Sequence, residues 1–193
     1  MADIPLDNIT GEVCEPVGGI AGKIYFAEHS DFTTITDPKE LCGESASAAA
    51  TLAELVTTPA NGLVLKDGKK FNVLDIVLET GEVTTTQIGE KKRRLFQNQI
   101  VGQVAGSGAN LLGFMRLIKN KDLVVLVEEV GSGNIRQFGS NRLPAWIEAQ
   151  EQKIEATFEG NNSLTITVMD KQKFPAPIYA GDITTTVVPP VGG

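Results

Sequence analysis

Apolar and polar residues alternate with a period of two along most of the chain from residue 63 onward. Turn residues such as Gly, Asn and Asp recur between these alternating runs, a combination that is typical of an antiparallel sandwich or barrel. The pattern predicts extended segments at 63–65, 71–79, 83–88, 95–104, 111–119, 123–130, 135–138, 154–158 and 164–168, and two shorter ones at 20–26 and 32–35.

Glycine-rich or Asn-rich turns join several of these segments into predicted hairpins. The turns at 105–110, 131–134 and 159–162 each lie between two apolar runs. In the last hairpin the apolar positions alternate cleanly, so one face is predicted to be buried and the other wet; these positions are Ile154, Ala156, Phe158, Leu164, Ile166 and Val168.

One segment, 45–56, has the pattern of a short amphipathic helix. Its alanines are followed by Leu52 and Leu55 on one side, Ser45 is placed to cap its start, and Pro59 lies beyond its end. We therefore expect a mainly β fold, an antiparallel β-sandwich or barrel with one main α-helix. The poorly periodic start (1–19) and the end with two adjacent prolines (182–193) are expected to be extended terminal arms.

Composition limits the number of domains and the kinds of partner. A chain of 193 residues fits one domain, here 1–193, with a sizeable core. The formal charge of −7 disfavours tight binding to DNA phosphates, although an acidic channel would let DNA slide without sticking. No apolar stretch is long enough for a membrane helix and the start lacks signal-peptide features, so a soluble, unexported protein with no membrane partner is expected.

Residues with catalytic or metal-binding chemistry are few. Cys14 and Cys42 fit no zinc-ligand spacing and are expected to be reduced thiols, and the lone His29 is interpreted as a loop histidine that meets water or a carboxylate. Carboxylates such as Glu128 and Glu129 show no spacing that indicates an acid/base pair. We therefore predict no enzyme and no catalytic, cofactor-binding or metal residues; a β-sandwich hydrolase or ligand-binding domain remains an alternative.

The block Lys91, Lys92, Arg93 and Arg94 is unusual because it places four adjacent cations in an acidic protein. The block is either a solvated hairpin tip or a subunit interface that complements an acidic patch on another copy of the chain. Contact with RNA or DNA is a further, smaller alternative. The four residues are the candidate site of the chain.

Taken together, these features resemble the major tail tube proteins of tailed bacteriophages. The resemblance is architectural for most of the chain, and it is more specific at 137–145 (QFGSNRLPA) and 174–181 (FPAPIYAG), which look like segments of phage virion structural proteins. It implies a homo-oligomer of stacked hexameric rings in the virion tail, assembled in the bacterial host cytoplasm.

The same resemblance implies the partners of such a ring. Inner strands would join into a continuous barrel, the segment 83–104 would form a long hairpin that reaches an adjacent subunit, and mainly acidic residues would face the lumen. Other phage tail proteins would bind the tube, and viral DNA would pass through it without specific binding. The same features would suit another virion structural protein, such as a tail terminator or a head decoration protein.

Overall fold

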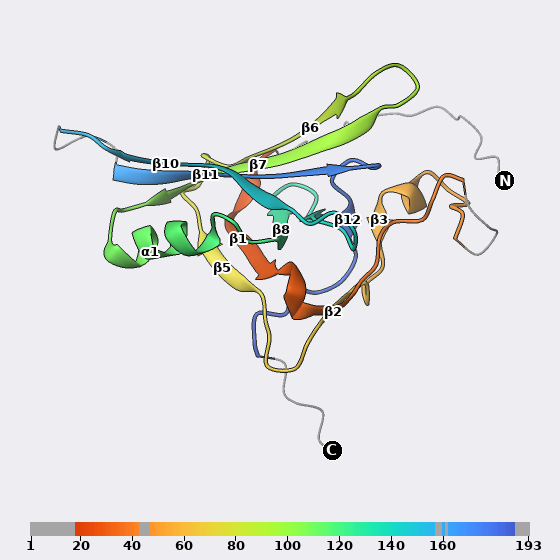
Figure 1. Ribbon diagram of the computed structural model, residues 1–193, viewed down its shortest axis with the longest axis horizontal. Helices are drawn as coiled ribbons and strands as arrows, with labels where there is room; N and C mark the ends of the chain where they lie inside the picture. The colour runs from red at the N-terminus through yellow and green to blue at the C-terminus, as the bar shows by residue number, and fades with distance from the viewer. Residues whose placement is uncertain (1–17, 43–46, 157–159, 161, 188–193) are drawn as a thin grey trace.

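The computed structural model describes residues 18–42, 47–156, 160 and 162–187. It contains a wholly antiparallel four-stranded sheet in the spatial order β10 (Trp146–Ile154), β11 (Asn162–Gln172), β7 (Leu95–Ala105) and β6 (Glu82–Ile88). In Figure 1 this sheet forms the upper layer, and the β6–β7 hairpin extends from it beyond the rest of the fold.

A second, six-stranded sheet lies beneath the first. Its spatial order is β3 (Thr57–Thr58), β12 (Ile178–Tyr179), β9 (Ile135–Phe138), β8 (Leu123–Glu129), β1 (Ile20–Glu28) and β5 (Asn72–Asp75). A separate pair of strands is formed by β2 (Phe32–Ile35) and β4 (Leu63–Leu65), and a 3-10 turn, η1 (His29–Asp31), joins β1 to β2.

The two sheets are covered to different extents. Strand β8 is buried at five consecutive residues, 123–127, because Val125 and Val127 face the four-stranded sheet while Val124 and Leu126 pack in a second cluster on the other side. This accounts for its continuous apolar sequence. The four-stranded sheet packs one face on the core between the sheets, and the alternation that the sequence predicts is seen in Leu164, Ile166 and Val168 of β11.

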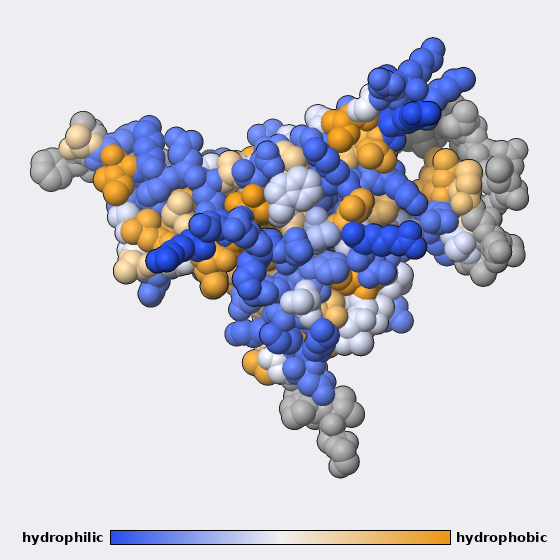
Figure 2. Space-filling model, in the orientation of Figure 1, coloured by the Kyte–Doolittle hydropathy of each residue, from blue (hydrophilic) through white to orange (hydrophobic). Residues whose placement is uncertain are grey.

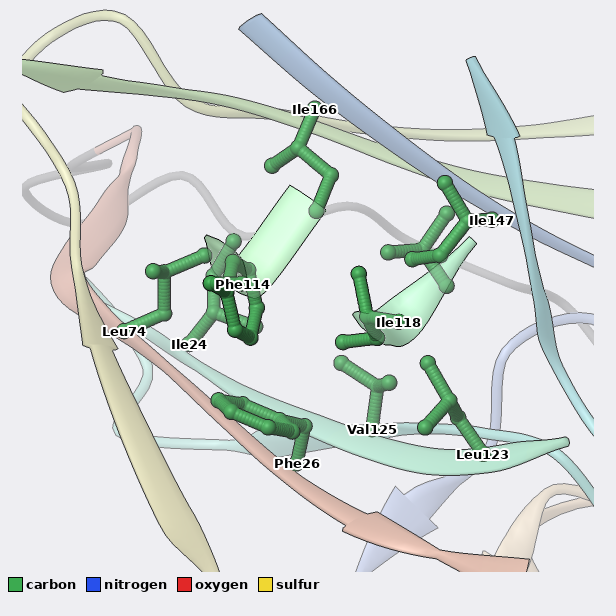
Figure 3. A pocket seen from close by; sticks show the side chains of 10 residues that line it. Ile24, Phe26, Leu74, Phe114, Ile118, Leu123, Val125, Ile147 and Ile166 are labelled. Atoms are coloured by element: carbon green, nitrogen blue, oxygen red, sulfur yellow. The ribbon is translucent and has the colours of Figure 1, made fainter. Parts of the chain in front are cut away.

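The main core lies between the sheets and includes side chains of α1 (Ala109–Ile118), the one α-helix in the described part of the chain. Figure 3 shows Phe114 and Ile118 of α1 with Ile147 of β10 and Ile166 of β11 around a small apolar cavity of about 10 Å³. A void of this size holds at most about one water molecule, so the helix fills most of the space beneath this part of the sheet.

The mainly β fold with one helix and several sheets is confirmed, but the predicted position of the helix is wrong. The segment 111–119, predicted as a strand, contains most of α1, because its buried and half-buried side chains follow helical spacing (Leu111, Phe114, Met115 and Ile118). In the predicted helix 45–56, the part described forms only the 3-10 turn η2 (Ala53–Leu55).

The alanines of that segment pair with a different part of the chain. The N–H of Ala49 donates to the carbonyl of Glu40 (2.9 Å), and the N–H of Glu40 donates to the carbonyl of Ser47 (3.0 Å). Ala48 and Ala49 are buried there, where small side chains permit close packing. Tertiary pairing thus replaces the intrahelical hydrogen bonds that the alanine content favours.

Of the last predicted hairpin, the second strand (164–168) is confirmed, but the strand that pairs with it lies earlier in the chain than the predicted 154–158. Leu164, Ile166 and Val168 of β11 are buried as predicted, but their partner β10 ends at Ile154, which is 68% exposed. The prediction for 157–158 lies outside the described residues, as do Ser45, Cys14, residues 1–17 of the N-terminal arm and 188–193 of the tail. The described part of the tail, 182–187, has no regular structure.

Candidate assembly surfaces

The four-stranded sheet ends in two edge strands, β6 and β10, of seven and nine residues. No strand of the described residues pairs with the outer side of either one. Because all neighbours in this sheet are antiparallel and the strands are even in number, β6 and β10 run in opposite directions. Unpaired edges of this kind present rows of backbone donors and acceptors that can accept another strand.

The uncovered face of this sheet is rich in uncharged polar side chains. The polar residues opposite the core positions are Thr84, Thr86, Gln97, Gln99, Gln103, Ser163, Thr165 and Thr167, and the same face also carries Val101, Ala105, Trp146, Ala149 and Met169. One of their hydrogen bonds joins adjacent strands, since Gln103 Nε2 donates to Ser163 Oγ at 2.8 Å. Ionisable groups on this face are few and of both signs: Glu82 and Glu151 are acidic, and Lys153 and Lys171 are basic.

The predicted candidate residues Lys91, Lys92, Arg93 and Arg94 lie together at the tip of the β6–β7 hairpin. All four are exposed, and Figure 2 shows the hydrophilic surface of this projecting tip. None of them is paired with a carboxylate within the described part of the chain. Their charges are thus directed outward and available to a partner.

Backbone geometry shapes this tip. Gly89 (φ 90°) and Lys92 (φ 70°) both have left-handed backbone, and a Cβ atom on Gly89 would lie 2.8 Å from the carbonyl oxygen of Arg93. The N–H of Arg93 donates to the carbonyl of Glu90 (3.0 Å), and Arg94 Nη1 donates to Gln87 Oε1 (3.0 Å). The tight turn therefore holds the four cations close together on a short loop.

A groove of about 620 Å³ lies beside β6, where the two sheets leave the sandwich open. Its lining includes Ile20, Val83, Thr85, Glu129 and Arg136. Arg136 Nε is paired with Glu129, and Arg136 Nη1 donates to the carbonyl of Ala176 at 3.1 Å. Burial acts to raise the pKa of Glu129, but hydrogen bonds from Ser132 and Arg136 outweigh it and hold this pKa below its usual range.

The deepest ionisable group is Asp170, which is 1% exposed on β11. Its carboxylate accepts hydrogen bonds from the N–H of Gly139 (2.7 Å) and from Asn98 Nδ2 (2.8 Å), and Asn98 in turn accepts one from the N–H of Ala176 (2.9 Å). Burial raises the pKa of Asp170, while these hydrogen bonds act in the opposite direction. The network ties loops to the sheets, and Ala176 and Thr85, which both donate to Asn98, also line the groove beside β6.

The residues considered for catalysis do not converge. His29 lies in the turn η1, and its Nε2 is 3.0 Å from the backbone carbonyl of Ser140. Cys42 is exposed and unpaired, and Glu129 is engaged with Arg136. No group of three His, Cys, Asp or Glu residues that could bind a metal occurs in the described ranges.

Comparison with known proteins adds no relative: no protein-family model, curated protein or solved structure matches the chain. Among the described helices, none has the length and apolar character needed to cross a bilayer.

Sequence reasoning located the basic tip but missed β10, α1 and the groove. Strand β10 carries Gln150 and Gln152 at positions opposite Ile166 and Leu164, so its buried side does not alternate in hydrophobicity. No periodic signal marks it as a strand. The helix did carry a signal, because the apolar spacing at 111, 114, 115 and 118 is helical.

Proposed function

We propose that this protein is a structural subunit that assembles with copies of itself into rings, with β6 of one copy pairing with β10 of the next. The observation that carries the proposal is the pair of free, oppositely directed edges on one antiparallel sheet. A rotation that brings β10 of one copy beside β6 of another makes the new contact antiparallel as well. Repetition of this heterologous contact closes a ring and removes every edge of that sheet.

The ring would turn the uncovered face of the sheet toward its lumen, with the six-stranded sheet and α1 outside. Neutral amide and hydroxyl groups would then line the channel, together with the apolar side chains of Val101, Trp146 and Met169 and the mixed charges of Glu82, Glu151, Lys153 and Lys171. This lining differs from the mainly acidic one that the resemblance implies. It suits passage of DNA equally well, because it has no cluster of cations to retain phosphates.

The basic tip would serve a second contact, between rings. It projects beyond the fold on the β6–β7 hairpin, and none of its four cations is paired with a carboxylate of the described residues. The acidic balance of the chain supplies complementary charge on other copies. We therefore infer a phage tail tube, with hexameric rings by resemblance, that serves as the conduit for genome delivery in the virion.

Sedimentation velocity and negative-stain microscopy of the purified full chain test this proposal. We expect rings or tubes whose amount rises with protein concentration. Lysines at Thr84 and Thr86 on the edge strand should weaken assembly, since charged residues blunt sheet edges. Lysines at Gln99 and Gln97, which lie opposite them on the inner strand β7, provide the matched control. A chain that stays monomeric at all concentrations would overturn the proposal.

A further inference from the structure

The second layer beneath the four-stranded sheet differs at its two edges. On the β10 side it is filled by α1, because Phe114 and Ile118 line the same cavity as Ile147 of β10 and Ile166 of β11 (Figure 3). On the β6 side it is open, and the groove of about 620 Å³ occupies that space. One edge of the sandwich thus presents a filled second layer and the other a hollow one.

One flank of α1 is exposed and carries a defined chemistry. Phe114 packs on Phe26 of β1, with ring centroids 5.4 Å apart. Leu112, Arg116 and Lys119 follow at spacings of four and three residues, on the side of the helix away from Phe114 and from the six-stranded sheet. All three are exposed, Leu112 by 47%. This flank is apolar at Leu112, near the start of the helix, and positively charged at Arg116 and Lys119, toward its end.

The groove offers the complementary surface. Ile20 and Val83 provide apolar lining, and Glu129, which is shared with Arg136, is the carboxylate that faces it. Glu82 lines the rim at β6, but it alternates with Val83, so its side chain belongs to the uncovered face of the sheet. An apolar contact bordered by charged residues is the arrangement found at specific protein interfaces.

We propose that the groove beside β6 binds the Leu112–Arg116–Lys119 flank of α1 from the adjacent copy. The inference rests on the proposed ring, because pairing of β10 with β6 brings the second layer of one copy, α1, against the open second layer of the next. The occupant of the groove is therefore a second copy of this chain. The helix flank and the groove fix the angle between neighbours, which strand pairing alone leaves free to vary.

Disulfide trapping tests the contact directly. In the full chain with Cys14 and Cys42 replaced by serine, Leu112→Cys is combined with Thr85→Cys in the groove, and assembled protein is oxidised with copper phenanthroline. Leu117→Cys with Thr85→Cys is the matched control, because Leu117 is also exposed, by 67%, but lies on the opposite flank of α1. We expect a ladder of linked chains on a denaturing gel from the first pair and monomers from the second.

A second pair of variants measures the energetic weight of the contact. Leu112→Asp should raise the protein concentration needed for assembly about tenfold or more, because it places a charge in an apolar contact. Leu117→Asp should leave that concentration within about twofold. Both positions are exposed, so thermal unfolding of the two monomers should match.

The outcomes separate this inference from the ring itself. Suppose that the wild type assembles but the Leu112→Cys pair gives no ladder, or that both pairs give equal ladders. Either result overturns the groove contact, and the proposed ring still stands. Equal effects of Leu112→Asp and Leu117→Asp on assembly would also overturn the groove contact but not the ring. A wild-type chain that never assembles overturns both.

Discussion

Neutralising the basic tip separates a role in assembly from a role in folding. Lys91, Lys92, Arg93 and Arg94 are all replaced by glutamine, which keeps the polar, flexible character of the loop. The side chains are exposed, and the hydrogen bond from Arg94 to Gln87 is the one side-chain contact of the tip within the described residues. Surface substitutions of this kind change stability by about 0.5 kcal/mol or less, so the unfolding midpoint should move by at most about 2 °C.

The effect on assembly should be much larger. Each exposed ion pair across an interface contributes about 0.2–1 kcal/mol, and a factor of ten in an association constant corresponds to about 1.4 kcal/mol. Four such pairs per contact therefore correspond to a decrease between a few-fold and several-hundred-fold. The difference between variant and wild type should shrink as salt is raised, because screening weakens the wild-type contact.

Sedimentation velocity over a range of protein and salt concentrations measures this decrease, and calorimetry measures the unfolding midpoint. A variant with glutamine at Lys23, Lys70, Arg142 and Lys173 is the control, since these cations are exposed on other parts of the fold. Equal assembly of the tip variant and the wild type at low salt would refute the contact and assign the block to a solvated tip.

Three further predictions concern the fold. Ile100→Ala, at a fully buried core position of β7, should lower the free energy of unfolding by about 2–5 kcal/mol in urea titrations. Val101→Ala, on the other face of β7, should lower it far less, and equal losses would contradict the assignment of faces. Gly139→Ala should cost more than Gly133→Ala, because both glycines have positive φ but only at Gly139 would a Cβ meet backbone, 2.6 Å from the carbonyl oxygen of Leu123. Burial raises the pKa of Asp170, so its stabilising contribution is fully present below the unfolded pKa of about 3.9 and is lost as the pH rises through the folded pKa. The wild type should accordingly gain stability relative to Asp170→Asn as the pH falls from 7 toward 4, and a difference that does not change with pH would contradict this assignment.

Residues with a strong alternating pattern were placed correctly from the sequence. Strands β2, β4, β5, β8 and β9 lie at or within the predicted segments, β1, β6 and β7 extend one or two residues beyond theirs, and the basic block lies at a hairpin tip between β6 and β7. These segments combine local periodicity with Gly or Asn turns, so their structure follows from nearby residues. Strands β6 and β7 and the exposed tip could therefore be predicted without knowledge of tertiary contacts.

The misplaced elements depend on distant partners. The segment 111–118 is apolar enough to read as a strand, and its helical form follows from packing Phe114 on Phe26 and Ile118 in the core. Strand β10 is defined by pairing with β11 rather than by its own pattern, since Gln150 and Gln152 occupy its inner positions. The two free edges and the groove arise from sheet order, which alternation along the chain does not encode.

Electron cryo-microscopy of the assembled full chain decides the central claim, the pairing of β6 with β10 between copies. We expect rings in which these two strands are antiparallel neighbours at every subunit boundary, so that the four-stranded sheets form one closed barrel. A particle in which both edges remain unpaired, or in which β6 pairs with β6 of a second copy, would contradict it.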